Sequence, residues 1–110
     1  MARKTWVTEI LLSSSILALA LSAHATLPTG GQVVPNSGQG TISSSDSSLT
    51  VQQTSDKIAL TWDTFSIGEG KKVTFEQPSS TSVALNQVLG SEVSVIQGSL
   101  EANGQIFLVN

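Results

Sequence analysis

The chain contains no cysteine, and its only histidine and only arginine, His24 and Arg3, both lie before position 26. A disulfide framework is therefore impossible. Residues 26–110 also lack the usual histidine and cysteine ligands of zinc, copper, haem and iron–sulfur sites. Ser–His–Asp and Cys–His catalysis are excluded there because the general base is missing. We expect no enzyme, no catalytic residue, no cofactor and no metal site.

Positive charge is scarce as well. Residues 26–110 contain three lysines, Lys57, Lys71 and Lys72, against seven carboxylates, which gives a net charge of −4. A nucleic-acid-binding surface needs clustered basic side chains that face the phosphates. We therefore expect no nucleic-acid partner.

The segment 1–25 has the pattern of a secretory leader. Arg3 and Lys4 give a positive start, an apolar stretch follows over 10–21, and Ala23-His24-Ala25 has the small-x-small form of a cleavage site. The apolar stretch is shorter than the roughly 20 residues that a spanning helix needs. We predict a cleavable signal-peptide helix over 1–25, cleaved after Ala25, and export of the domain over 26–110.

The remainder alternates apolar and polar residues with a period of two, which predicts an all-β domain. Pairs at this spacing are Leu49/Val51, Ile58/Leu60, Val73/Phe75, Val83/Leu85 and Ile106/Leu108, and Ser43–Ser48 is expected to be a loop. Such short strands fit an antiparallel sandwich or barrel. They equally fit a parallel β-helix, in which each coil stacks on its neighbours.

Two observations favour stacked coils. Ile42, Trp62, Leu85 and Ile106 follow one another at similar intervals in the sequence, as one inward position on successive coils would. Ser, Thr, Asn and Gln together make up about two-fifths of the chain after the leader. Such small and amide side chains suit coils in which like residues lie above one another and share hydrogen bonds.

Five segments, in this order and spacing, resemble the amino-terminal secretion domain of two-partner-secreted exoproteins, the filamentous haemagglutinin-like family. They are Leu27–Val34, Ile58–Gly68, Val73–Pro78, Ser82–Asn86 and Ala102–Asn110. The resemblance implies a right-handed parallel β-helix with an amino-terminal cap, exported by the Sec machinery of a Gram-negative bacterium. It implies a partner too, an outer-membrane barrel with periplasmic POTRA domains. The passenger, an adhesin, cytolysin or contact-dependent toxin of a virulence system, would alone meet a host-surface ligand.

The resemblance also assigns residues. The cap would be formed by Leu27, Pro28, Gly30 and Gly31, and the approach to the secretion motif would be formed by Asn103, Gly104, Gln105, Phe107 and Asn110. In the family an Asn-Pro-Asn-Gly motif follows the segment that matches Phe107-Leu108. Asn110 would be its first residue, so we expect 26–110 to be the first part of a longer domain.

Three local alternatives are weighed against this interpretation. Trp62 and Phe65 would suit a sugar-binding platform, but the Ile58-Leu60 alternation continues into Trp62, so we expect both in the core together with Val83 and Leu85. Asp56 and Asp63 are spaced to mark the ends of one strand rather than a glycosidase pair. The alternative function is a small freestanding, lectin-like binding domain of β-sandwich type.

Overall fold

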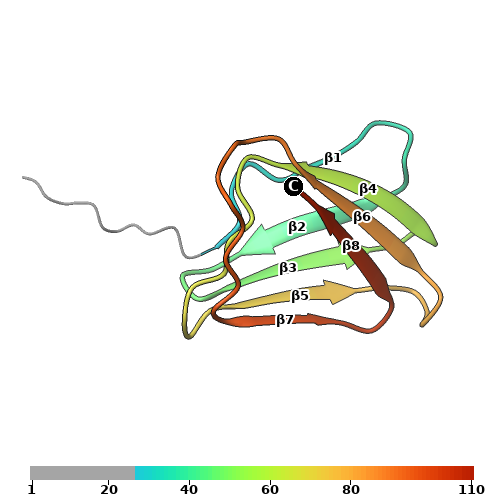
Figure 1. Ribbon diagram of the computed structural model, residues 1–110. Helices are drawn as coiled ribbons and strands as arrows, with labels where there is room; N and C mark the ends of the chain where they lie inside the picture. The colour runs from blue at the N-terminus through green and yellow to red at the C-terminus, as the bar shows by residue number, and fades with distance from the viewer. Residues whose placement is uncertain (1–26) are drawn as a thin grey trace, which may run out of the picture.

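The computed structural model describes residues 27–110, and the predicted signal-peptide helix and its cleavage residues Ala23 and Ala25 lie outside them. The described part is all-β, as predicted (Figure 1). Its strands are β1 (Gln32–Val33), β2 (Gly40–Ser44), β3 (Ser48–Gln53), β4 (Lys57–Trp62), β5 (Lys72–Glu76), β6 (Val83–Val88), β7 (Ser99–Ala102) and β8 (Gln105–Val109). Within 27–110 no helix has the length and apolar character needed to cross a membrane.

The strands form two four-stranded sheets that face each other, in the orders β1-β4-β6-β8 and β2-β3-β5-β7 (Figure 1). Within each sheet the last three strands are parallel, namely β4-β6-β8 and β3-β5-β7. The chain alternates between the sheets, so each parallel partner lies one coil further along. These ladders are unlike those of an antiparallel sandwich, the alternative that the sequence left open.

The first strand of each sheet breaks this pattern, because β1 pairs antiparallel with β4 and β2 pairs antiparallel with β3. The sheets are therefore mixed, whereas the expected architecture was parallel. The β2–β3 hairpin also corrects the expectation of a loop over 43–48, since only three residues separate the two strands. Antiparallel strands can be joined by such a short turn, whereas parallel strands need a longer connection.

Register sets the rows of inward side chains. One sheet stacks Ile58 on Ala84 on Ile106, and the other stacks Val51 on Phe75 on Ala102. Successive members of a row thus lie one coil apart. The number of residues between them along the chain is slightly larger than the interval expected from the sequence. The expected period is about right, but the residues proposed to share one position do not share it.

The core between the sheets contains three buried aromatic rings, of Trp62, Phe65 and Phe75. Trp62 and Phe65 are both buried, and their rings meet edge to face with centroids 5.2 Å apart. The prediction that they belong to the core is confirmed, so neither forms an exposed sugar platform. Ile67 is fully buried on a third, short side of the coil, where it bridges to Ile96.

The prediction that Val83 and Leu85 of β6 point into the core is wrong, because the other face of this strand points inward. Ala84, Asn86 and Val88 point inward, while Leu85 is 43% exposed and Val83 is half-buried. Register explains the difference, because Leu60 pairs with Asn86 and the inward face must continue through it. The indole Nε1 of Trp62 donates a 2.9 Å hydrogen bond to Asn86 Oδ1, so an inward polar residue satisfies a buried donor.

Candidate functional site

The amino-terminal end of the stack is closed by the segment that leads into β1. Gly31 lies against the indole of Trp62, and a Cβ at this position would overlap the ring. Gly30 has φ +67 and lies against the carboxylate of Asp63. Glycine fits here because it adopts positive φ without strain and leaves room for the close approach.

Hydrogen bonds attach this segment to the end of β4. Thr29 N donates to Thr64 O at 3.1 Å, Asp63 N donates to Thr29 O at 2.8 Å, and the Thr29 and Thr64 hydroxyls lie 2.7 Å apart. Pro28 is buried and Leu27 packs against the core. The structure thus places the four predicted cap residues together at one end of the core.

The other end of the stack has a different construction. Strands β7 and β8 are the last strands of their sheets, and both lie at the same end of the molecule (Figure 1). Within 27–110 each has a strand neighbour on one side only, β5 for β7 and β6 for β8. The free sides expose backbone groups that can pair with a further strand.

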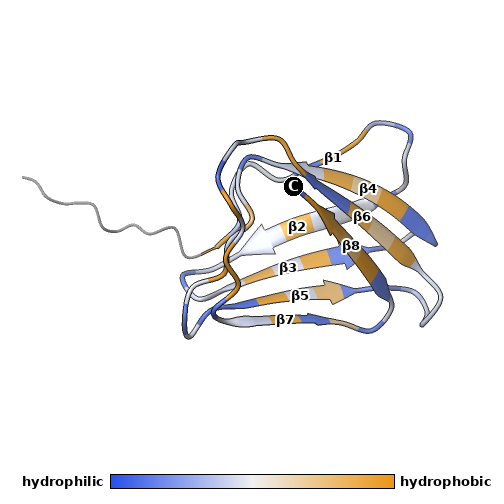
Figure 2. Cartoon of the chain, viewed as in Figure 1, coloured by the Kyte–Doolittle hydropathy of each residue, from blue (hydrophilic) through white to orange (hydrophobic). Residues whose placement is uncertain are grey.

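Apolar side chains of the last coil point toward the space above the core. Leu100 and Ile106 are partly buried, whereas Leu108 is 38% and Ile96 is 41% exposed. Figure 2 shows the apolar colour over most of β8. The end of the core is therefore uncovered here, and we call these four residues the open end.

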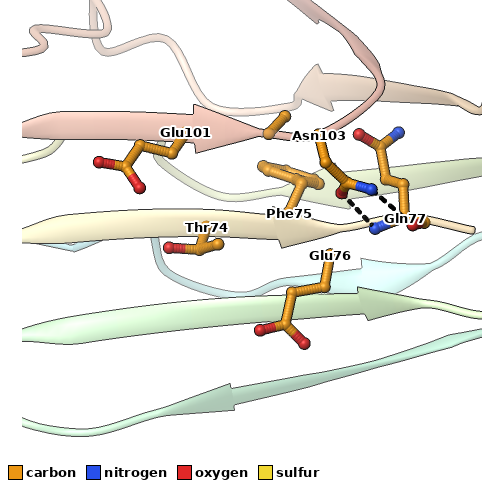
Figure 3. Close-up of a pocket in the computed structure, with 7 residues that line it drawn as sticks. Thr74, Phe75, Glu76, Gln77, Glu101 and Asn103 are labelled. Atoms are coloured by element: carbon orange, nitrogen blue, oxygen red, sulfur yellow. Dashed lines mark hydrogen bonds between the residues drawn. The ribbon is translucent and has the colours of Figure 1, made fainter. Parts of the chain in front are cut away.

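Asn103 joins the last coil to the one below it (Figure 3). Its Oδ1 accepts a hydrogen bond from Gln77 N at 2.7 Å, and its Nδ2 donates to Gln77 O at 2.7 Å. The side-chain amide thus pairs with the backbone of the neighbouring coil as a further strand residue would. This turn lies between β7 and β8, which belong to different sheets, so Asn103-Gly104 is a coil turn rather than a hairpin.

The side chain of Gln77 completes the connection. Gly104 N donates to Gln77 Oε1 at 2.8 Å, and Gln77 Nε2 donates to Gln105 O at 3.1 Å and to Gln53 Oε1 at 3.2 Å. Gln53 and Gln77 are both buried. We call Gln77, Asn103 and Gly104 the amide clasp. Gln53 and Gln77 thus share a hydrogen bond between like side chains, of the kind that the composition suggested for stacked coils, although the sequence did not single out either residue.

A hollow lies beside the clasp, between β5 and β7 (Figure 3). It is lined by Thr74, Phe75, Glu76, Gln77, Glu101, Ala102 and Asn103. It lies where the row Val51–Phe75 continues into the much smaller Ala102. Its charged residues are two carboxylates with no basic residue in the lining, so it has no feature that favours an anionic ligand.

The outer face of the β6–β8 ladder carries an apolar pair that includes one residue expected in the interior, Leu85. Leu85 is paired in register with Phe107, and Phe107 is 52% exposed. Val109 follows on the same face and is 48% exposed. Of the predicted recognition residues, Phe107 is therefore accessible, whereas Asn103 and Gly104 make contacts within the fold.

Asn110 secures the loop that precedes β7. Its Oδ1 accepts a hydrogen bond from Ser94 Oγ at 2.7 Å, and its Nδ2 donates to Glu92 O at 3.2 Å. Gln105 contributes its carbonyl to Gln77 and its N–H to Ser82 O. The five residues assigned to recognition thus lie along one edge of the molecule.

Charged side chains form no site in the described part of the chain. Asp56 makes an exposed ion pair with Lys57 at 3.5 Å, and Lys71 Nζ donates to the carbonyl of Asp46. Residues 27–110 hold no cluster of three metal-ligating side chains. Within 27–110 the geometry offers unpaired strand edges on β7 and β8 and exposed apolar side chains beside them.

A family model described as the TPS secretion domain, where TPS denotes two-partner secretion, matches residues 25–110. The chain belongs to this family. The family expected from the sequence is confirmed, and it is a family of secretion domains of exoproteins, not of enzymes. Proteins that carry the domain are secreted exoproteins of Gram-negative bacteria.

Relatives and a solved structure agree with this assignment. A heme/hemopexin-binding protein of Haemophilus influenzae strain Rd is 34% identical over 104 residues, which are 94% of this chain and 11% of the relative. Another heme/hemopexin-binding protein of Haemophilus influenzae is 48% identical over 62 residues, 56% of this chain and 7% of the relative. The crystal structure of the HMW1 secretion domain from Haemophilus influenzae superposes with a TM-score of 0.68 at 29% identity and covers 76% of this chain and 22% of that one. The chain spans about a tenth of the length of the first relative.

Proposed function

We propose that residues 26–110 form the first coils of the module that addresses a long exoprotein to an outer-membrane transporter and then starts its folding. The leader over 1–25 would direct the chain through the Sec machinery and be cleaved after Ala25. A barrel with periplasmic POTRA domains would then recognise the segment that includes Phe107 and Asn110. Outside the cell the chain would wind into a right-handed parallel β-helix.

The difference between the two ends carries this proposal. The first end is closed by antiparallel strands and glycine contacts, while the other presents free parallel edges on β7 and β8. A free strand edge supplies backbone hydrogen bonds to any further strand. Burial of Leu108 and Ile96 beneath a further coil would add hydrophobic stabilisation of about 25 cal/mol per Å². Folding would therefore proceed away from the closed end as polypeptide is delivered.

The haem chemistry in the relatives' names does not fit these residues. Haem iron in proteins is held by histidine, cysteine, methionine or tyrosine, and residues 26–110 contain none of the four. A haem-binding activity of the whole exoprotein would therefore use residues outside this segment. Adhesion, cytolysis and contact-dependent toxicity are likewise properties that a passenger would supply.

The proposal is tested by secretion from a Gram-negative host that makes the complete exoprotein together with the transporter from the same genome. Phe107→Asp should lower the amount in the medium by roughly tenfold, because a large aromatic side chain in a recognised segment often supplies much of the binding energy of an interface. Val93→Asp is the matched control, because Val93 is 76% exposed and lies outside the recognition segment. Immunoblots of medium and periplasm measure the distribution.

Retention of the Phe107→Asp protein in the periplasm, with Val93→Asp secreted normally, supports recognition through this segment. Secretion of both variants at the level of the unsubstituted protein contradicts it. Secretion of the unsubstituted exoprotein in the absence of the transporter would contradict the two-partner assignment of this chain as a whole.

A further inference from the structure

The amide clasp contains an Asn-Gly pair whose chemistry depends on whether the coils are stacked. Asn103 is exposed to solvent, and Gly104 follows it with no side chain to hinder ring closure. In an unfolded chain this pair is the most favourable sequence for intramolecular attack of a backbone nitrogen on an asparagine side chain. The function proposed above makes no use of this reactivity.

The reaction open to Asn103 is deamidation. Gly104 N loses its proton to a base in the solvent and attacks Asn103 Cγ, after which the Cγ–Nδ2 bond breaks and the nitrogen leaves as ammonia with a proton from water. The product is a five-membered succinimide. Water then adds to one of its two carbonyls and opens the ring to aspartate or isoaspartate. No oxidant or reductant takes part.

In the stacked coil the three reacting groups are all occupied. Gly104 N donates to Gln77 Oε1 at 2.8 Å, so its proton and its direction are fixed. Asn103 Oδ1 and Nδ2 are held by the backbone N and O of Gln77, each at 2.7 Å. Attack requires the nitrogen to leave Gln77 and the amide to rotate, which breaks all three hydrogen bonds.

We propose that Asn103-Gly104 is a deamidation site that the folded structure protects. Deamidation then occurs only in chains whose last coil is not stacked on the preceding one. The product then prevents stacking. An aspartate at 103 retains an acceptor for Gln77 N but places a carboxylate oxygen against Gln77 O, where the amide had donated. Isoaspartate in addition lengthens the backbone by one carbon within the turn that leads into β8.

The first test measures the rate of deamidation. The full chain is incubated at one pH and temperature in buffer and in urea, and peptide mapping by mass spectrometry follows conversion at Asn103 and at Asn36, which lies in a loop. Conversion at Asn103 should be slower in buffer by roughly tenfold or more, since local opening must come first. Gln77→Met should raise the rate in buffer and leave the rate in urea unchanged.

The second test measures the consequence of deamidation by hydrogen exchange. Asn103→Asp should lose protection at the amides of β8 while the amides of β4 remain protected. Asn36→Asp is the matched control, because it introduces the same charge at a residue with φ +66, a conformation that aspartate tolerates. Equal rates at Asn103 in buffer and urea would overturn the proposal, as would β8 protection unchanged by Asn103→Asp. If Asn103→Asp fails to fold, the rate comparison on the unsubstituted chain decides the matter.

Discussion

The edge strands at the two ends of the stacked sheets differ in length and in composition. At the amino-terminal end the edge strands are β1, with only two residues, and β2, which is mostly Gly, Ser and Thr. At the other end the edge strands are β7, which reads Ser-Leu-Glu-Ala, and β8, which reads Gln-Ile-Phe-Leu-Val with no charge and no proline. Short or polar edges discourage further pairing, whereas a long apolar edge favours it.

This difference indicates a direction of assembly. The closed end buries its aromatic rings and satisfies the indole N–H, so it is complete within the described residues. The open end leaves Leu108 exposed, and Phe107 beside it is exposed on the outer face. Stability should therefore be concentrated near β4 and should decrease toward β8, as expected where coils contact only their neighbours.

The largest effect is expected at the closed end. Trp62→Ala should lower the free energy of unfolding by about 3–5 kcal/mol, because it leaves a cavity and removes the partner of Phe65. Urea denaturation of the full chain measures the change. Ile106→Ala, at the open end, should cost less than half as much. Equal losses at the two positions would show that stability is uniform along the stack.

A somewhat smaller effect is expected from the cap glycine that contacts the indole. Gly31→Ala should destabilise the chain by about 1–3 kcal/mol through overlap with Trp62. Gly70→Ala provides the control, because Gly70 has φ +81 with open space around its Cβ position, so only the backbone preference of about 1–2 kcal/mol is lost. Thermal unfolding measures both variants. A lower melting temperature for Gly70→Ala than for Gly31→Ala would contradict the proposed role of the cap.

The polar contact inside the core gives a third comparison. Asn86→Ala removes the acceptor of the buried indole N–H and should cost about 1–3 kcal/mol. Gln87→Ala removes an exposed side-chain amide from the same strand and should cost less. Fluorescence-monitored urea denaturation serves for both, and a shift of tryptophan emission in Asn86→Ala would report the changed surroundings of Trp62. No change in either quantity would mean that water replaces Asn86.

The smallest effect on stability is expected at the open end. Leu108→Thr should change the free energy of unfolding by about 0.5 kcal/mol or less, because this side chain is 38% exposed in the folded chain. The free apolar edge of β8 should allow copies of the chain to associate, and Leu108→Thr should reduce this association because it interrupts the edge. Sedimentation velocity across a range of concentrations measures this. If the Leu108→Thr chain associates as strongly as the unsubstituted chain, the associating surface does not include the edge of β8.

Much of the fold was predictable from local patterns. The alternating pairs in β3, β4, β5 and β8 were assigned to strands, because a period of two is read directly from the residues. The strands β1, β2 and β7 were missed, because they are short and only weakly alternating, and part of β2 was expected to be a loop. The recognition residues were assigned only through the family, since they form no chemical motif, and that assignment stays a prediction.

Other features required the register between distant segments. The alternation in β6 fits either face, and the pairing of Leu60 with Asn86 decided that Leu85 points outward. The importance of Gln77 could not be inferred because its partners, Asn103 and Gly104, lie a full coil further along the chain.

By itself the sequence determined that the domain is β-rich, lacks histidine and cysteine chemistry after the leader, and belongs with secretion domains. Those properties reside in composition, in short-range periodicity and in segment order. Tertiary structure alone decided which end is closed, which apolar residues lie outside and which amide holds the last coil. These depend on the register between strands one coil apart, and register is set by the packing of whole faces rather than by any one segment.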